Sequence, residues 1–303
     1  MRIISVIICA FLSTACGHNN SKPDTLAESR NGHVYIPLDP LPVSRQDSVG
    51  CKKKKALLDA LPDLTSRLAT KKFTATGNVQ YGVFTTSAKN EQFEIILDYM
   101  KTDTAPGTFI VSRKVSRSKP YKDFLFTYKR VDYEPGEVIG PFEVVPPSIE
   151  TQYDIRRYKE GDVIKPNEKK IRIPIYVGLG IRMRAQVATL TAEAKLSSLP
   201  IVAAEVAAGN LSGQLVVQTI GVTGETIDAV MPLPAELNET TLTNSLLAMG
   251  GIKAQIYSLE DKNTTARIIG FYNPYGFAGE DFNNALIEVL ADNSHVWNVP
   301  CAD

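Results

Sequence analysis

An uninterrupted alternation of apolar residues over positions 171–187 constrains the fold of this chain more than any other feature of its sequence. Successive side chains of a β-strand point to opposite faces, so the alternation predicts a long strand with one buried face. The buried positions are Ile171, Ile173, Ile175, Val177, Leu179, Ile181, Met183, Ala185 and Val187. We expect the opposite face to contact water, and it carries Arg172, Tyr176, Arg182, Arg184 and Gln186.

The first sixteen residues combine a basic start at Arg2, a short apolar run over 3–12 and a small-residue end, Ser13-Thr14-Ala15-Cys16. This segment resembles the signal of bacterial lipoproteins. The resemblance implies that the chain is cut before Cys16 and that Cys16 receives a lipid. It implies a place in the cell envelope, at the outer rather than the inner membrane because Gly17 follows the cysteine.

The segment departs from the lipoprotein pattern at Ser13, where that class usually has leucine. Ordinary signal-peptide cleavage after Ala15 therefore stays an alternative, and it would leave a free terminal thiol on Cys16. A transmembrane helix is a poor third choice, because the apolar run is far shorter than the roughly 20 residues that a bilayer requires.

The cysteines point to an oxidising compartment. Cys9 leaves with the signal and Cys16 carries the lipid, so the mature chain keeps only Cys51 and Cys301. Two thiols at opposite ends of an exported body predict one disulfide that pins the C-terminal tail beside the first ordered segment. The alternative is a pair of buried, unpaired thiols.

We divide the chain into a signal peptide (1–15), a lipid-anchored flexible linker (16–50), a region with a helix and antiparallel strands (51–150), and an α+β region organised on the strand at 171–187 (151–303). The last two regions also fit a single domain. Within the linker, residues 34–41 offer an alternative edge strand, because Pro37 and Pro40 are incompatible with a central one.

Periodicity and turn residues predict the remaining elements, and together they indicate an α+β fold that is mainly antiparallel β-sheet with several short helices. Expected helices cover 54–69, 199–208, 238–249 and 282–290. Expected strands cover 73–84, 92–100, 109–115, 124–133 and 215–222, followed by a hairpin of 252–259 with 266–272.

Motifs for common chemistries are missing from the sequence. It has no nucleophile elbow, metalloprotease motif, phosphate-binding loop or Cys-x-x-Cys pair. Gly178-Leu179-Gly180 begins like a dinucleotide-binding turn, but the strand pattern continues through it, so we expect a place where a neighbour packs closely. His295 is the only histidine outside the signal and linker, and we expect it to pack with Trp297 at the surface.

Lys and Arg equal Asp and Glu at 33 each, which gives no electrostatic reason to expect a nucleic-acid partner. We predict a lipid-anchored envelope protein that binds or scaffolds another envelope protein or polymer, without cofactor or metal. Tyr272, Tyr275 and Phe277 form the candidate binding surface, although they also fit a turn that covers the core.

Two other functions remain open. A strand with one apolar face and arginines on the other also suits a membrane-inserting, pore-like assembly, in which Arg172, Arg182 and Arg184 would line a lumen. A hydrolase of envelope polymers would need two carboxylates to converge in a cleft. The candidates for that pair are Glu143, Glu150, Glu193, Glu280 and Asp281.

Overall fold

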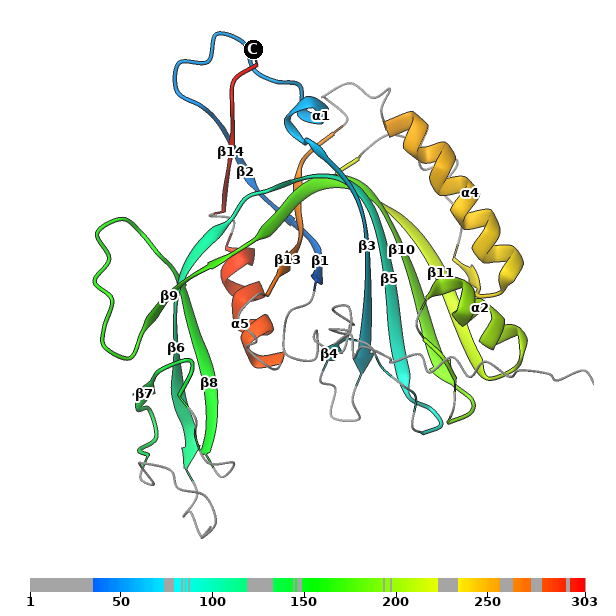
Figure 1. The fold of residues 1–303 in the computed structure, drawn as a ribbon, viewed down its shortest axis with the longest axis horizontal. Coiled ribbons are helices and arrows are strands. Elements are labelled where there is room, and N and C mark those ends of the chain that lie inside the picture. Colours follow the sequence, from blue (N-terminus) through cyan, green and yellow to red (C-terminus); the bar gives the residue numbers. More distant parts are fainter. Residues whose placement is uncertain are drawn as a thin grey trace, which may run out of the picture.

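The computed structural model describes residues 35–73, 79–82, 84, 86, 88–118, 133–143, 145, 149–192, 194–196, 198–222, 234–256, 264–273, 280–292 and 295–302 (Figure 1). These residues form mostly antiparallel β-sheet with a smaller share of helix. The predicted fold class is therefore correct in outline, although the chain is richer in strand than a typical α+β protein.

The main sheet is built around β10 (Ile175–Thr189), the strand predicted by the alternation. One edge of β10 pairs with β5 (Gln92–Thr104), and β3 (Asp63–Phe73) and β4 (Val79–Tyr81) follow. The other edge pairs first with β13 (Arg267–Tyr272) and then with β11 (Leu211–Ile220). The sheet is completed by β1 (Tyr35–Pro42) beside β13 and by β12 (Ala235–Glu236) beside β11.

The second sheet is a continuation of the first. The β5–β10 register pairs Thr104 with Tyr176, and it runs on unchanged where β6 (Gly107–Ser118) pairs with β9 (Lys169–Ile173). Pro106 and Pro174 therefore lie opposite each other where the two-stranded ribbon bends over the top of the molecule (Figure 1). Proline has no amide hydrogen, so neither residue can extend the ladder through the bend. β7 (Val138–Ile139) and β8 (Ile149–Arg157) complete this sheet.

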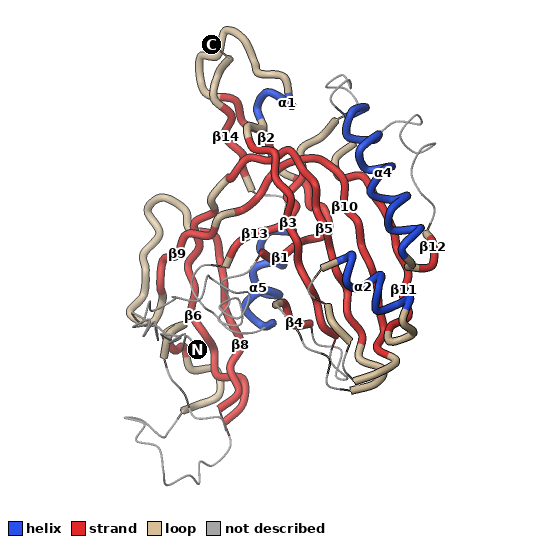
Figure 2. The backbone as a smooth tube through the Cα atoms, turned by 45° about the vertical axis from the view of Figure 1, so that its right-hand side comes forward, coloured by secondary structure: helices blue, strands red, loops and turns tan. Residues whose placement is uncertain are grey.

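Helices cover one face of each sheet. α2 (Leu199–Ala207) and α4 (Glu239–Ile256) pack beside β10 and β11, and α5 (Glu280–Ala291) packs against β8 and β1 (Figure 2). α1 (Leu57–Ala60) is a single turn. β2 (Ser44–Asp47) and β14 (Val296–Val299) form a separate parallel pair near the C-terminus. None of the described helices is both long and apolar enough to cross a bilayer.

The apolar face predicted for the central strand is confirmed. All nine alternating side chains from Ile171 to Val187 are buried in the main core. The prediction of a wet opposite face is wrong for Arg182, which is fully buried, and for Tyr176, which is 9% exposed. Arg184 is partly buried, whereas Arg172 and Gln186 are exposed as expected. β1 covers the middle of this face, because the backbone oxygen of Leu38 accepts a hydrogen bond from the Arg182 guanidinium.

Two predicted elements are corrected by the structure. The helix expected over 54–69 ends at Ala60, and β3 begins at Asp63 directly after Pro62. The helix expected over 238–249 continues through Gly250 and Gly251 as α4, and residues 252–256 are helical instead of forming a hairpin strand. Met249, Ile252 and Ile256 are buried against the core, so their packing outweighs the roughly 1 kcal/mol that each glycine costs in a helix.

The folded body begins at Tyr35, within the region 16–50 that we predicted to be a flexible linker. β1 and β2 lie within 16–50, and β1 forms an edge strand of the main sheet with Tyr35, Ile36 and Leu38 buried. The disulfide between Cys51 and Cys301 is confirmed, with its two Cα atoms 5.3 Å apart. It joins the segment that follows β2 to the C-terminal tail after β14, across 250 positions of sequence.

Candidate functional site

The main sheet has a second face, opposite to α2 and α4, which we call the polar face. It is defined by the even-numbered residues of β5, β10 and β11 and by the odd-numbered residues of β3, because the strand registers align these positions in rows. One row runs across the sheet through Lys71, Glu94, Gln186, Gln214 and Glu236. The next row towards the strand ends contains Phe73, Gln92, Ala188 and Ser212.

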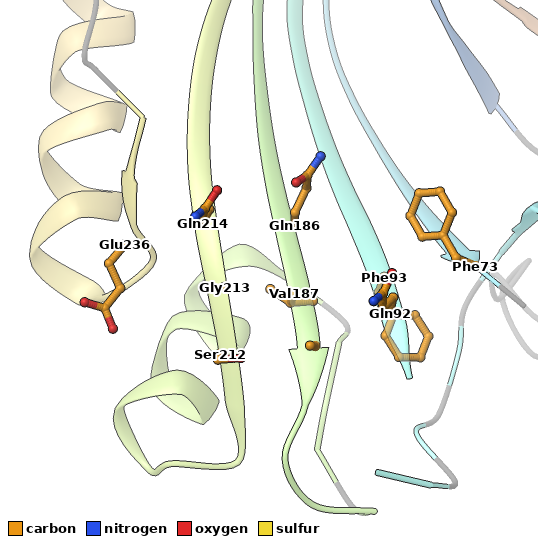
Figure 3. Close-up of a pocket in the computed structure, with 10 residues that line it drawn as sticks. Phe73, Gln92, Phe93, Gln186, Val187, Ser212, Gly213, Gln214 and Glu236 are labelled. Atoms are coloured by element: carbon orange, nitrogen blue, oxygen red, sulfur yellow. The ribbon is translucent and has the colours of Figure 1, made fainter. Parts of the chain in front are cut away.

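All residues of these two rows except Lys71 and Glu94 line an open pocket of about 670 Å³ at the end of the polar face. Gln92, Gln186 and Gln214 come from three neighbouring strands, with Phe73 at one end and Glu236 at the other (Figure 3). The side chains of the three glutamines are exposed, and within the described structure their amides have no hydrogen-bond partner. The pocket therefore presents free amide donors and acceptors on a rigid sheet.

Ion pairs around the buried carboxylate of Glu94 lie beside the pocket, in the row of Gln186 and Gln214. Lys71 Nζ lies 2.9 Å from Oε2 of Glu94, which is only 3% exposed, and Arg184 Nε lies 3.7 Å from the other oxygen of Glu94. Arg184 also pairs with Asp39. Burial alone would raise the pKa of Asp39, but the hydrogen bond and charge of Arg184 outweigh it and lower that pKa. Of the described residues that line the pocket, Glu236 alone carries a charge.

No protein-family model, curated protein or solved structure matches this chain. The chemistry of the side chains is therefore the guide to what the pocket binds. The lining combines three amides, one hydroxyl, one carboxylate and two aromatic residues, Phe73 and Phe93. Its polar groups suit the orientation of a polar molecule by hydrogen bonds.

The middle of the polar face is closed and holds a buried network. Asp98 and Arg182 form a two-point ion pair with distances of 2.6 and 2.7 Å, and the Tyr35 hydroxyl donates to Asp98 at 2.6 Å. Burial raises the pKa of Tyr35 well above its usual value, and the Asp98 carboxylate raises it further, so the phenol stays protonated. Arg182 is thus held inside the protein and does not face an open channel.

Of the aromatic surface expected at Tyr272, Tyr275 and Phe277, only Tyr272 lies in the described part of the chain. Tyr272 is half-buried and packs against the small core of Tyr35, Ala69, Met100, Tyr176, Ile220 and Ile269. Cys16 also lies outside the described residues. The pocket at the end of the polar face is a site that the sequence analysis did not identify.

His295 and Trp297 do not form the expected surface pair. Both are buried, at 3% and 0% exposure, and Trp297 Nε1 donates a hydrogen bond of 2.7 Å to Asp103. His295 contacts the backbone oxygen of Ala105 through Nε2 and the Arg157 guanidinium through Nδ1. Burial and the charge of Arg157 lower the pKa of His295 to about 4, so the imidazole is neutral at physiological pH.

The structure describes the side chains of three of the five candidate carboxylates, Glu143, Glu150 and Asp281. Glu143 accepts a hydrogen bond from Tyr133 at 3.1 Å, Glu150 lies on β8, and Asp281 lies on α5. The side chains of Glu193 and Glu280 lie outside the description. Within the described residues, no group of three or more His, Cys, Asp and Glu is arranged to hold a metal ion.

The close packing expected around Gly178 and Gly180 is present, but the neighbour is the backbone of β5. A Cβ atom on Gly178 would lie 2.3 Å from the Lys101 oxygen, and one on Gly180 would lie 2.3 Å from the Tyr99 oxygen. These glycines therefore allow the close approach of β5 to β10.

Proposed function

We propose that this protein is an exported, lipid-anchored component of the cell envelope that binds a polar partner without transforming it. The observation that carries the proposal is the set of unpaired amides of Gln92, Gln186 and Gln214 on three neighbouring strands. Unpaired polar groups on rigid strands are well placed to orient a ligand.

The charges of the pocket favour binding over hydrolysis. Glycoside hydrolysis typically uses an acid and a base or nucleophile, which are two carboxylates flanking the bond to be cut. The described lining of the pocket has one carboxylate, Glu236, and the nearby Glu94 is engaged by Lys71 and Arg184. A pocket of this composition holds its ligand by hydrogen bonds.

The proposed location in the cell envelope follows from the N-terminal segment and agrees with the disulfide. Disulfides form and persist in exported proteins, and the Cys51–Cys301 bond ties the C-terminal tail to the segment after β2. A lipid on Cys16 would hold this body at a membrane by its N-terminus.

The proposed lipid anchor and membrane location are tested by comparing the full-length chain with a Cys16→Ala variant in a bacterial host. We expect the wild-type N-terminal peptide to carry acyl chains by mass spectrometry and the protein to sediment with membranes, whereas the variant does neither. A wild-type protein that lacks acyl chains would contradict the lipid anchor.

The binding site is tested by placing a photo-crosslinking amino acid at Gln186 in cells. The matched control carries the same amino acid at Gln152, an exposed glutamine on β8 of the other sheet. We expect crosslinked products from Gln186 that do not form from Gln152. Identical products, or none, from the two positions would argue against the pocket as the binding site.

A further inference from the structure

We infer that the ligand of this pocket is an uncharged glycan chain that lies across the strands, from Phe73 towards Glu236. This inference rests on the proposed binding function and deepens it by naming the ligand class. Three observations support it. They are the order of the side chains across the sheet, their lack of positive charge, and the pairing of β10 with a neighbouring strand on both edges beneath them.

Amide side chains match the hydroxyl groups of a sugar. Each glutamine amide offers two N–H donors and a carbonyl acceptor, so one side chain can pair with two neighbouring hydroxyls of a ring. Gln186 and Gln214 are direct cross-strand partners, and Gln92 lies one row further on β5. All three are exposed on the same face, so a chain of hydroxyl-bearing units can contact them together.

The charge of the lining disfavours anions. Among the described lining residues Glu236 is the only charged one, and Lys71, which lies in the same row outside the lining, is paired with Glu94. Nucleic acids and phosphate-bearing ligands are bound by arginine and lysine side chains, which this lining does not provide. An acidic polysaccharide would likewise meet the Glu236 carboxylate without a compensating cation.

The backbone beneath the pocket is closed to an added peptide strand. β10 is hydrogen-bonded to β5 on one edge and to β11 on the other over the whole pocket, from Arg184 to Ala188. Peptides that add to a sheet need a free strand edge with unpaired backbone groups. A ligand on this face therefore meets no free strand edge over this stretch, and the side chains of the two rows are its main contacts.

Phe73 gives the row a distinct apolar end. Its ring lies at the edge of the pocket beyond Gln92, half-buried and facing the same side as the amides (Figure 3). An aromatic ring can cover the C–H face of a sugar ring while the glutamines pair with its hydroxyls. The pocket therefore combines an apolar platform at one end with hydrogen-bonding groups along its length.

The dimensions call for more than one sugar unit. Five strands carry the two rows, from β3 to β12, and neighbouring strands are spaced by about 4.8 Å, so the rows span roughly 19 Å. A single ring covers only part of this length. We expect affinity to rise with chain length until the row is filled.

The test uses purified full-length protein and calorimetric titration with uncharged hexose oligosaccharides of increasing length and different linkage. The test variant Gln186→Met/Gln214→Met keeps the side-chain length and removes the amides, and Gln152→Met on β8 is the matched control. Losing two hydrogen bonds of about 1 kcal/mol each should weaken binding by about tenfold or more. The control should bind like the wild type, and polygalacturonate should bind weakly.

The possible results separate the two proposals. Length-dependent binding that the double variant weakens and Gln152→Met does not would support a glycan ligand. Crosslinking at Gln186 without binding of any uncharged oligosaccharide would overturn the glycan inference and leave the binding function in place. Tighter binding of polygalacturonate than of every uncharged chain would also overturn it. The absence of both crosslinking and glycan binding would reject both proposals.

Discussion

The carboxylate of Asp98 and the guanidinium of Arg182 face each other on β5 and β10 as a fully buried, two-point ion pair. Both side chains are 0% exposed. The remaining donors of Arg182 reach the backbone oxygens of Leu38 and Ile269, and Tyr35 donates to Asp98. One ion pair therefore fastens β1 and β13 onto the centre of the main sheet.

Replacing Asp98 by alanine should remove about 3 to 5 kcal/mol from the free energy of unfolding, because it leaves a buried guanidinium without its counter-charge. Urea denaturation of the wild type and the Asp98→Ala variant measures this difference.

The matched control removes both charges. Apolar residues of similar size often replace a buried ion pair at little cost, so Asp98→Leu/Arg182→Met should recover most of the lost stability. A loss of less than about 1 kcal/mol in Asp98→Ala would mean that water or another group replaces the carboxylate.

The burial of Arg182 also shows which part of the fold could be predicted from the sequence. The alternation along β10 is local, and it correctly identified the buried face. Whether the other face is wet depends on β1, which is about 140 positions earlier in the chain and crosses over Arg182. No pattern within β10 contains that information.

The helix expected over 54–69 was wrong for a related reason. Leu64 and Leu68 fit a helical spacing, but they lie on β3 and are 50% and 36% exposed. Asp63, Arg67 and Lys71 alternate with them, and pairing with β5 decides the structure. Pro62 was the local signal that the helix ends, because proline removes a helix hydrogen bond.

The candidate site could not be predicted because its residues come from separate strands. Gln92, Gln186 and Gln214 form a surface only once the β5–β10 and β10–β11 registers are fixed. Of these three residues, only Gln186 was predicted to be exposed, from the alternation along β10. No sequence motif describes this site, because its three glutamines are far apart in the sequence and become neighbours only through strand pairing.

Stability should fall in mild acid because of His295. The folded pKa is about 4, below the usual 6.5, so the unfolded state binds the extra proton between these values. The contribution of the neutral His295 imidazole to the free energy of unfolding is therefore complete above about pH 6.5. It declines as the pH falls towards about 4, by about 3 kcal/mol in all. Between about pH 7 and about pH 5, the free energy of unfolding of the wild type should fall by about 2 kcal/mol more than that of His295→Gln.

The geometry explains the direction of this effect. Nε2 of His295 donates to the Ala105 oxygen, which leaves Nδ1 as the acceptor for Arg157 at a distance of 2.9 Å. A proton added at Nδ1 would face the guanidinium. If wild type and His295→Gln lost stability in parallel, the histidine would not be the titrating group.

The Cys51–Cys301 disulfide should contribute about 5 kcal/mol by the loop-closure model, since its loop contains about 250 residues. Replacing both cysteines by serine should lower the midpoint of chemical denaturation, and reduction of the wild type should lower it to the same level. Thiol labelling provides a direct check. Two reactive thiols at Cys51 and Cys301 in denatured, unreduced mature protein would contradict the bond.

Gly180 should not tolerate a side chain, because the Tyr99 oxygen of β5 lies where its Cβ would be, at 2.3 Å. The obstructing atom is backbone, so Gly180→Ala must push β5 and β10 apart, and we expect a loss of about 1 to 3 kcal/mol by urea denaturation. Gly250→Ala on α4 is the matched control. It meets nothing within 4 Å, and the same substitution there should stabilise the helix by about 0.5 to 1 kcal/mol. Opposite signs for one chemical change would show that the close approach of β5 selects glycine, whereas a neutral Gly180→Ala would show that the ribbon can relax.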